Sequence, residues 1–186
     1  VIDSDGNTTL TADTITVNAS QFNVNSGATL NITTTDTETG TTFSNLSTDQ
    51  GALSVIDGSA HIGGDTLVFN NNTSSSHGAG LYYKETTTGL DSSVVLDAEN
   101  ITFSNNTSNY SASSGGAVFN SGGDVSILGD TNTFTGNQIL GTDVDENRAF
   151  VSEAWRLHDA GFPVPEVVAA ADDCSCYLQE DLGDTL

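Results

Sequence analysis

The sequence has very few basic residues. It contains 3 Lys and Arg against 25 Asp and Glu in 186 residues, which gives a formal net charge of -22. A field of this sign repels phosphate backbones and anionic lipid headgroups, and few cations are available to displace the counterions of a nucleic acid. The composition therefore argues against nucleic-acid binding and against attachment to an anionic membrane surface.

Long apolar runs and methionine are also missing. No stretch approaches the roughly 18 consecutive apolar residues of a membrane-spanning helix, and the first residues lack the charged start and apolar core of a signal peptide. The sequence thus predicts no membrane insertion by this segment. Because it contains no Met, we expect it to be a fragment or a mature piece of a longer product.

Charged residues of both signs are scarce, and small polar residues take their place. The charged fraction is 15%, compared with about a quarter in an average globular protein. Gly, Ser, Thr and Asn dominate the composition, but 35% of the residues are still hydrophobic and occur in short, regular bursts. This combination is typical of a repetitive β structure and not of a disordered chain.

A repeated pair of sequence markers runs through the first 140 residues. The first marker is Phe-x-x-Asn, and the second, after a polar spacer, is Gly-Ala followed by an aliphatic residue. The first occurs at Phe22–Asn25, Phe69–Asn72, Phe103–Asn106 and Phe134–Asn137, with a degenerate copy at Phe43–Leu46. The second occurs at Gly27–Thr29, Gly51–Leu53, Gly78–Leu81 and Gly115-Gly116-Ala117-Val118. The spacing is irregular, so we expect insertions to be looped out.

Short strands are predicted between these markers. Runs of alternating or briefly continuous apolar residues, bounded by Gly, Asn or Asp, occupy residues 14–17, 28–32, 66–69, 93–96, 101–103 and 125–128. A single turn of such a chain cannot bury its own apolar side, whereas stacked turns share a core of Phe, Val, Ile and Leu. Asn at the corners tolerates a left-handed backbone and can hydrogen-bond along the stack. We therefore predict a mainly β fold, a parallel β-helix over residues 1–140.

These markers resemble a known repeat. Phe103–Asn106 followed by Gly115–Val118 is similar to the repeat of the polymorphic outer-membrane protein family, and the resemblance covers roughly residues 20–140. Proteins of that family are autotransporter-type surface proteins with β-helical passengers implicated in adhesion. The resemblance implies a structural role for Phe22, Asn25, Phe69, Asn72, Phe103, Asn106, Gly115, Gly116, Ala117, Phe134 and Asn137.

The sequence changes character after about residue 140. Residues 141–186 contain both Pro, both Arg, both Cys and the single Trp. Apolar residues at helical spacing predict a helix over residues 146–158 with a buried stripe that includes Val151, Ala154 and Trp155, ended by Gly161. Strands are predicted over residues 166–170 and 176–180. We therefore expect a short α/β appendage to the β-helix.

This second segment is similar to part of the small lobe of the aminoglycoside phosphotransferase family, in particular to bacterial amino-sugar kinases. The resemblance rests on Glu146–Phe150, Gly161–Val167 and Tyr177–Asp184. It implies that Gln179, Glu180, Asp181 and Leu182 correspond to the nucleotide hinge, and that Glu146 or Glu153 corresponds to the helix carboxylate. Phosphoryl transfer also needs a strand lysine, a catalytic loop and a metal-binding Asp. The single lysine is Lys84, so we predict a kinase-like fragment without catalysis.

Other reactive side chains do not form a recognisable site. Cys174 and Cys176 lack a second pair for zinc, and His61, His77 and His158 lack metal-ligand spacing. The run Asp3–Asn7 offers oxygen ligands without the distal Glu of a calcium loop, and we interpret it as a solvated turn. Asp143 and Asp145 have no defined partner for glycoside hydrolysis. We predict no catalytic residue, no metal and no cofactor.

The prediction is a structural and adhesive module that is exposed on the cell surface, in the outer membrane or secreted. Its contacts, with a protein or a glycan at a host or neighbouring surface, would be made by segments near residues 74–77, 84–91 and 108–114. Tyr82, Tyr83 and Tyr110 are candidates for such contacts, although strand packing is an alternative role for them. Two alternative functions stay open: a fragment of an ATP-dependent aminoglycoside or amino-sugar phosphotransferase, and a glycan-cleaving β-helix enzyme.

Overall fold

The fold was analysed in a computed structural model, which describes residues 2–35, 40–87, 89–110, 115–139, 144–161, 167–170 and 177–179. Backbone contacts divide the chain into two compact units, Val1–Leu140 and Gly141–Leu186. The cysteines at 174 and 176, Asp143 and the hinge residues Glu180, Asp181 and Leu182 lie outside the described residues. Gln179 is the last residue of a short strand of the second unit.

Three parallel sheets make up the first unit. Sheet A, with five strands, consists of β1 (Ile2–Ser4), β4 (Phe22–Val24), β8 (Leu53–Ile56), β11 (Leu81–Lys84) and β14 (Val118–Ser121). Sheet B consists of β2 (Asn7–Ala12), β3 (Ile15–Val17), β5 (Thr29–Thr34), β6 (Thr41–Ser44), β9 (Ser59–Asn70), β12 (Ser93–Ser104), β15 (Asp124–Ile127) and β16 (Thr131–Thr135). Sheet C consists of β7 (Ser47–Thr48), β10 (Thr73–Ser74), β13 (Thr107–Ser108) and β17 (Gln138–Ile139).

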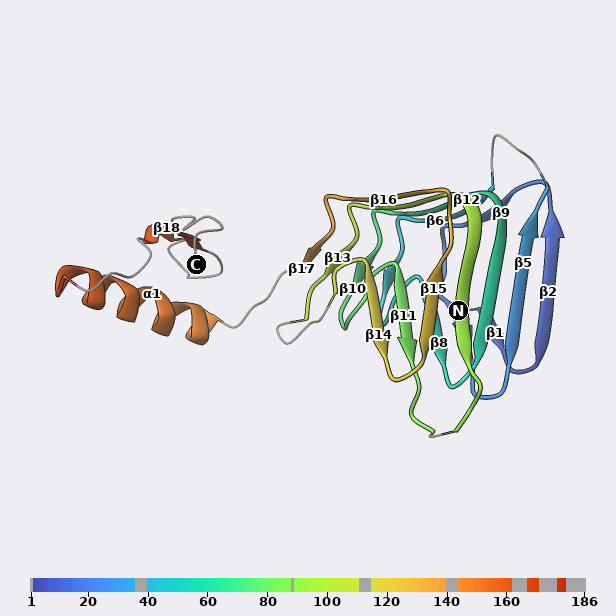
Figure 1. The fold of residues 1–186 in the computed structure, drawn as a ribbon, viewed down its shortest axis with the longest axis horizontal. Helices are drawn as coiled ribbons and strands as arrows, with labels where there is room; N and C mark the ends of the chain where they lie inside the picture. The colour runs from blue at the N-terminus through green and yellow to red at the C-terminus, as the bar shows by residue number, and fades with distance from the viewer. Residues whose placement is uncertain are drawn as a thin grey trace. The chain divides into compact units, whose positions relative to one another are not determined.

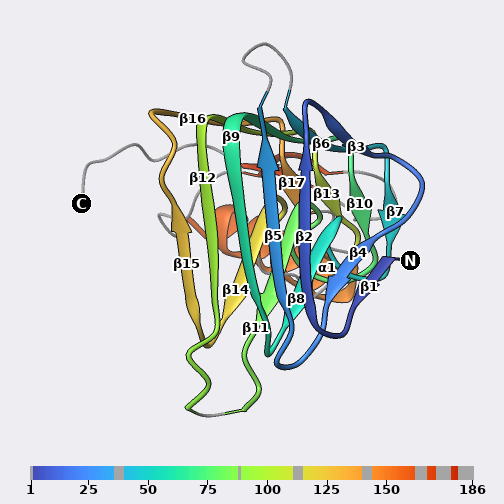
Figure 2. The same cartoon turned by 90° about the vertical axis from the view of Figure 1, so that its right-hand side faces the viewer.

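The chain visits these sheets repeatedly and always in the same direction. We define a coil as one passage of the chain through a strand of sheet A and the following strands of sheet B. A coil also includes the strand of sheet C that follows them, where one is present. Strands β2, β5, β9, β12 and β15 lie side by side in chain order, one from each coil (Figure 1; Figure 2). Every strand pair within the first unit is parallel. The predicted mainly β fold with parallel sheets is therefore confirmed.

The strands of sheet B are longer than the sequence predicts. Two separate strands are predicted at 93–96 and 101–103, whereas β12 runs without interruption from Ser93 to Ser104. Asp97 and Glu99 are exposed while Ala98 between them is buried, and the alternation then shifts by one position, because Asn100 is also exposed and Ile101 is buried. Polar residues on the outer face do not end a strand, which explains the difference.

A column of stacked phenylalanine rings runs through the core. Phe43, Phe69, Phe103 and Phe134 occupy the same register position in successive coils. Their ring centroids are 4.8, 4.6 and 5.0 Å apart in that order, with interplanar angles of 5–6°. The first three rings are fully buried, whereas Phe134 is 51% exposed. The copy at Phe43, which looked degenerate in the sequence, therefore belongs to the column.

The Asn residues of three markers, Asn72, Asn106 and Asn137, form a ladder beside this column. The side chain of Asn72 donates to the Oδ1 atom of Asn106 at 2.9 Å and to the backbone oxygen of Phe43 at 3.0 Å. Asn106 repeats both bonds with Asn137 and Phe69, each at 2.9 Å. The left-handed corner predicted for this Asn lies one residue earlier, because Asn45, Asn71 and Asn105 have φ values of 57, 53 and 53°. The left-handed backbone and the hydrogen bonds along the stack, both predicted for the Asn of the marker, therefore belong to two adjacent residues.

The first predicted copy of the repeat is out of phase with the others. Phe22 lies in sheet A, where it pairs with Leu53, and not in the phenylalanine column. Val17 pairs with Phe43 and takes the column position in the first coil. Asn25 donates to the carboxylate of Asp5 outside the Asn ladder. Both sheets place an aromatic or aliphatic residue inward before a polar turn, so the local pattern does not reveal which sheet a copy enters.

The Gly-Ala markers at Gly51, Gly78 and Gly115 lie just before strands of sheet A, where neighbouring coils approach closely, whereas the marker at Gly27–Thr29 leads into β5 of sheet B. The backbone amides of Gly78, Ala79 and Gly80 donate to the backbone oxygens of Gly115, Gly116 and Ala117, each at 2.9 Å. A Cβ atom on Gly116 would collide with the backbone oxygen of Gln138 in the same coil, and Gly115 has a φ of 83° that favours glycine. These two positions therefore require residues without side chains.

The second unit contains a helix and a two-stranded antiparallel sheet among its described residues. Helix α1 (Val144–Asp159) is followed by strands β18 (Val167–Ala170) and β19 (Tyr177–Gln179). Val151 and Ala154 of the helix pack on Val167. Trp155, predicted to lie in the buried stripe, is 50% exposed, and its indole nitrogen donates to the backbone oxygen of Val167 at 3.3 Å. The polar edge of the indole therefore directs this side chain to the border of the small core.

Candidate surface-contact site

The outer face of sheet A carries a row of side chains that do not belong to the core. In the strands of this sheet, Phe22, Leu53 and Leu81 point into the core cluster. The residues that follow them lie on the opposite face, because side chains alternate along a strand. Register pairing aligns Asn23, Ser54, Tyr82 and Phe119 into one row across four coils. The row changes from amide and hydroxyl groups to aromatic rings along the stack.

An aromatic cluster, His77, Tyr82, Tyr110 and Phe119, forms at one end of this row. The ring of Phe119 stacks on Tyr82 with centroids 5.1 Å apart and on His77 with centroids 4.3 Å apart. Tyr110 meets His77 edge to face at 5.2 Å. Tyr110 is 42% exposed, whereas Tyr82 is nearly buried. The cluster thus has a packed base and an exposed rim.

A polar groove continues the row at its other end. This groove, of about 320 Å³, is lined by Gln21, Asn23, Val24, Asn25, Asp49, Gln50, Ser54 and Ile56. The hydroxyl of Ser54 donates to Oε1 of Gln50 at 2.9 Å, which orients the amide of Gln50. Lys84 pairs in register with Ile56 and is exposed. Aromatic rings, oriented amides and one cation therefore share a single face.

The electrostatics of this face follow from burial and from the sparse positive charge. Burial raises the pKa of the Tyr82 hydroxyl, so this side chain stays neutral at physiological pH. Lys84 is the only basic residue among residues 1–140 apart from histidines. The face can thus offer stacking surfaces and hydrogen bonds to a partner, together with one localised positive charge in a strongly acidic protein.

The segments predicted to make contacts are only partly brought together. His77 from the segment 74–77 and Tyr110 from the segment 108–114 meet in the aromatic cluster. The segment 84–91 instead turns to another corner, where Thr86 and Thr87 bind Asp57. Of the three tyrosines considered, Tyr83 lies in the core, and its hydroxyl lies 2.8 Å from Oγ of Ser92. Tyr82 and Tyr110 belong to the cluster.

At this corner, the carboxylate of Asp57 accepts hydrogen bonds from the two neighbouring threonines, Thr86 and Thr87. The amide of Thr86 donates to Oδ1 at 2.6 Å and that of Thr87 to the same atom at 3.1 Å. The hydroxyls of both threonines donate to Oδ2. These bonds, that from the Thr86 hydroxyl above all, lower the pKa of Asp57 from 3.8 to about 2.

We expect this corner to loosen in acid. Because the pKa of Asp57 is lower in the folded chain, its contribution to stability is complete above about pH 4 and is lost as the pH falls towards 2. Amide hydrogen exchange should show falling protection factors for Thr86 and Thr87 between about pH 4 and pH 2, while Asn106 keeps its protection. In Asp57→Asn, protection at both threonines should be lower and independent of pH over this range. An unchanged pH dependence in Asp57→Asn would assign the effect to another carboxylate.

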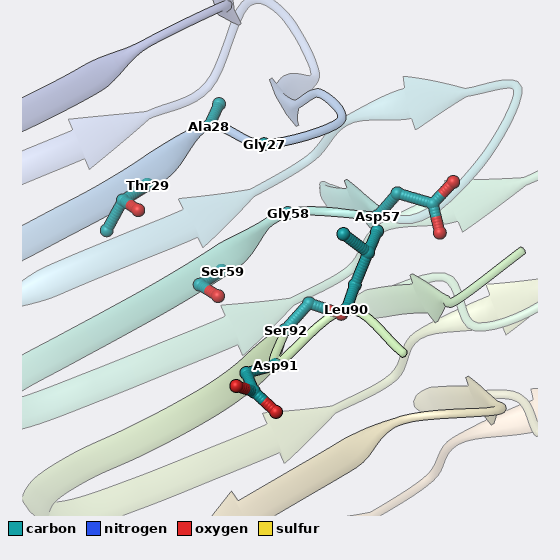
Figure 3. Close-up of a pocket in the computed structure, with 9 residues that line it drawn as sticks. All are labelled: Gly27, Ala28, Thr29, Asp57, Gly58, Ser59, Leu90, Asp91 and Ser92. Carbon is teal, nitrogen blue, oxygen red and sulfur yellow. The ribbon is translucent and has the colours of Figure 1, made fainter. Parts of the chain in front are cut away.

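A small pocket lies beside this corner. It has a volume of about 210 Å³ and is lined by three stretches from different coils, residues 27–29, 57–59 and 90–92. Asp57 and Asp91 both line it, and their carboxylates point away from each other (Figure 3). Because the Asp57 carboxylate is occupied by Thr86 and Thr87, the pocket does not present the facing carboxylate pair that glycoside hydrolysis uses.

The remaining candidate ligands and nucleophiles stay apart. Within the described part of the chain, no three His, Cys, Asp or Glu side chains are arranged to hold a metal ion. His61 lies 3.7 Å from the carboxylate of Asp97 and His158 lies 3.9 Å from that of Asp159, on separate units. Lys84 lies in β11, outside the segment that resembles a kinase. Over the same residues, no helix has the length and apolar character needed to cross a membrane.

Sequence reasoning missed the aromatic cluster as a unit. Its members come from three segments, and nothing in the local pattern marks His77 or Phe119 as neighbours of Tyr110. The signal that could have identified it is the alignment of the Gly-Ala markers, which places Tyr82 and Phe119 at the same offset after Gly78–Ala79 and Gly115–Gly116. The equal offset therefore predicts the contact between Tyr82 and Phe119. The contacts of His77 and Tyr110 depend on the loops at the corners.

Two segments of the chain match a known family of repeats. Residues 66–84 and 100–121 match the Chlamydia polymorphic membrane protein repeat. Each match begins within a long strand of sheet B and ends at the last residue of the next strand of sheet A, so it spans one Phe-x-x-Asn marker and one Gly-Ala marker. Searches of curated proteins and of solved structures gave no match to the chain. The predicted resemblance is thus confirmed for these two segments, which carry the sequence pattern of this membrane-protein repeat.

Proposed function

We propose that residues 1–140 form a parallel β-helix that serves as a structural and adhesive module on the cell surface, in the outer membrane or after secretion. The observation that supports this most directly is the coincidence of the matched repeats with successive coils of the parallel sheets. The family description concerns membrane proteins, which favours a location at the bacterial envelope. The module would hold its contact surface rigidly and carry out no reaction.

Contact with a partner is proposed to occur on the outer face of sheet A. Tyr110 offers an exposed ring, and the groove beside Ser54 offers amide groups that can bind polar groups of a protein or a glycan. Tyrosine is favoured at such surfaces because it combines a large apolar area with a hydroxyl and has few rotatable bonds. The net charge of -22 keeps nucleic acid away from the same surface.

The second unit is proposed to be a kinase-like small-lobe fragment that does not catalyse phosphoryl transfer. Its described elements are one helix and two antiparallel strands, and none of them carries a lysine. Without the strand lysine that positions the phosphates of ATP, such a fragment lacks one of the groups that phosphoryl transfer needs. The adhesive role is therefore assigned to the first unit.

Binding of the fluorescently labelled chain to cultured epithelial cells tests the proposed contact surface. Tyr110→Ser should weaken binding roughly 5- to 30-fold, since an exposed aromatic anchor in a contact surface contributes about 1–2 kcal/mol. Phe134→Ser is the matched control, because it removes an aromatic ring of similar exposure outside the aromatic cluster. Prior treatment of the cells with protease or with glycosidases separates a protein partner from a glycan.

Three results would contradict the proposal. If the chain binds cells no better than an unrelated protein of similar charge, the adhesive role is wrong. If Tyr110→Ser and Phe134→Ser lose the same binding, the outer face of sheet A is not the contact surface. Release of reducing ends from glycans by the purified chain would replace the adhesive role by that of a glycan-cleaving enzyme.

A further inference from the structure

The polar groove on the outer face of sheet A arises because side chains of different size follow one another in the same row. Asn23 and Ser54 take the row positions that Tyr82 and Phe119 take in the two following coils. The shorter side chains leave a hollow of about 320 Å³, lined by residues in and next to β4 and β8. Small-molecule sites have volumes of about 300–1,000 Å³. The groove therefore suits a compact group, such as a single sugar ring.

Hydrogen-bonding groups of both kinds line this groove. Asn23 and Gln50 carry amides, which donate and accept, and Asp49 carries a carboxylate, which only accepts. The hydroxyl of Ser54 donates to Oε1 of Gln50 at 2.9 Å, so the amide of Gln50 is oriented and its NH2 group is the donor for a ligand. Neighbouring hydroxyls of a sugar ring each donate and accept. They match this combination of groups, and Ile56 adds apolar surface for the C–H groups of the ring.

Exposed aromatic surface lies on the same face, a short distance from the groove. Ser54 pairs in register with Tyr82, and Tyr82 pairs with Phe119. Because neighbouring strands are about 4.8 Å apart, the backbone of Phe119 lies about 10 Å from that of Ser54. Tyr82 is nearly buried, whereas Tyr110 at the rim of the cluster is 42% exposed. The faces of sugar rings carry C–H groups that pack on aromatic rings, so a glycan of two or more rings can contact both the groove and the cluster.

The charge of this face selects among glycans. Asp49 lines the groove, and Asn25, which also lines it, donates to the carboxylate of Asp5. The whole chain has a net charge of -22. A sialylated or sulfated glycan would be repelled by this field, whereas an uncharged glycan would not. The exposed Lys84, which pairs with Ile56, is a single positive charge and does not reverse the sign of the field.

We propose that this face binds a neutral oligosaccharide, with one sugar ring in the groove beside Gln50 and a following ring packed on Tyr110. The proposal rests on the adhesive role and narrows its partner from a protein or a glycan to an uncharged glycan. A stable contact with a protein buries about 800 Å² per partner around an apolar centre. Among the described residues of this face, the large hydrophobic side chain that is exposed is Tyr110, and it stands beside a polar hollow.

Glycans released from the same epithelial cells provide the probe, after anion-exchange chromatography has separated them into a neutral and an acidic fraction. The neutral fraction should displace most of the labelled chain from the cells, and the acidic fraction at equal sugar concentration should not.

The groove is tested by measuring the apparent dissociation constant of the chain on beads that carry the neutral fraction. Gln50→Leu removes hydrogen bonds at similar side-chain size and should raise this constant roughly 3- to 10-fold. Asn100→Leu is the matched control, because it replaces an exposed amide on the outer face of sheet B, and it should leave the constant unchanged. Equal circular dichroism spectra and unfolding midpoints of both variants and the unaltered chain show that the fold is retained.

The outcomes separate this inference from the adhesive role. If the chain binds cells through Tyr110 but neither fraction displaces it, the partner is a protein, so the adhesive role stands and the inference is wrong. Displacement by the acidic fraction that is lost in Lys84→Gln would replace the neutral glycan by an anionic one. Equal constants for Gln50→Leu and Asn100→Leu would exclude the groove as the site. A chain that binds neither the cells nor either fraction contradicts the adhesive role and this inference together.

Discussion

Replacing Phe69 by alanine is expected to lower the free energy of unfolding by about 3–5 kcal/mol, the usual cost of removing a buried aromatic ring. The ring of Phe69 is fully buried and stacks on both faces, 4.8 Å from Phe43 and 4.6 Å from Phe103. Its removal leaves a cavity in the middle of the column and separates the two halves of the stack. Denaturant unfolding followed by far-UV circular dichroism measures the change.

Phe134→Ala provides the matched control for this substitution. Phe134 occupies the same column, stacks on Phe103 alone among the rings of the described residues, and is 51% exposed. Phe134→Ala removes about half as much buried apolar surface as Phe69→Ala and leaves no enclosed cavity. We therefore expect the free energy of unfolding to fall by about 1–2 kcal/mol. Similar losses in the two variants would mean that the column does not form a continuous core.

Asn106→Leu is expected to destabilise the chain by about 3–6 kcal/mol although the two side chains are similar in size. The side chain of Asn106 donates to the backbone oxygen of Phe69 and to Oδ1 of Asn137, and it accepts from the backbone and side-chain nitrogens of Asn72. Leucine leaves two or three of these buried groups without partners, at a cost of about 1–3 kcal/mol each. The same denaturant titration measures the loss.

The neighbouring residue offers a control for the loss of the ladder. Asn105 is exposed and has a φ of 53°, so its role is conformational. Asn105→Gly retains the left-handed corner and should change the stability by less than about 1 kcal/mol. If Asn105→Gly costs as much as Asn106→Leu, the corner and not the ladder is the main support of the stack.

The repeat itself could be predicted from sequence because its markers are local. The spacing of Phe and Asn within Phe69–Asn72 and Phe103–Asn106 places both residues inward at one turn, and the ring column and Asn ladder follow from stacking two such turns. The phase of the first copy could not be predicted. Inserted residues vary between coils, and an inward Phe before a polar turn occurs in sheet A at Phe22 as well as in sheet B at Phe43.

The candidate contact surface could not be predicted from the sequence, because it is formed by residues that are distant from one another along the chain. Strand alternation predicts that Tyr82 and Tyr83 point to opposite faces, but it does not tell which of them enters the core. The structure places Tyr83 inside and Tyr82 outside, next to Phe119 from the following coil. Asp57 likewise had no signal in the sequence, since its partners Thr86 and Thr87 lie 29 and 30 residues away.

By itself, the sequence determined that this protein is acidic, mainly β and repetitive, because charge, strand alternation and turn residues are properties of neighbouring positions. Only the tertiary structure decided which residues form the shared column and which face carries the aromatic cluster. These depend on the register between coils, and register is set by hydrogen bonds and packing between residues more than 20 positions apart.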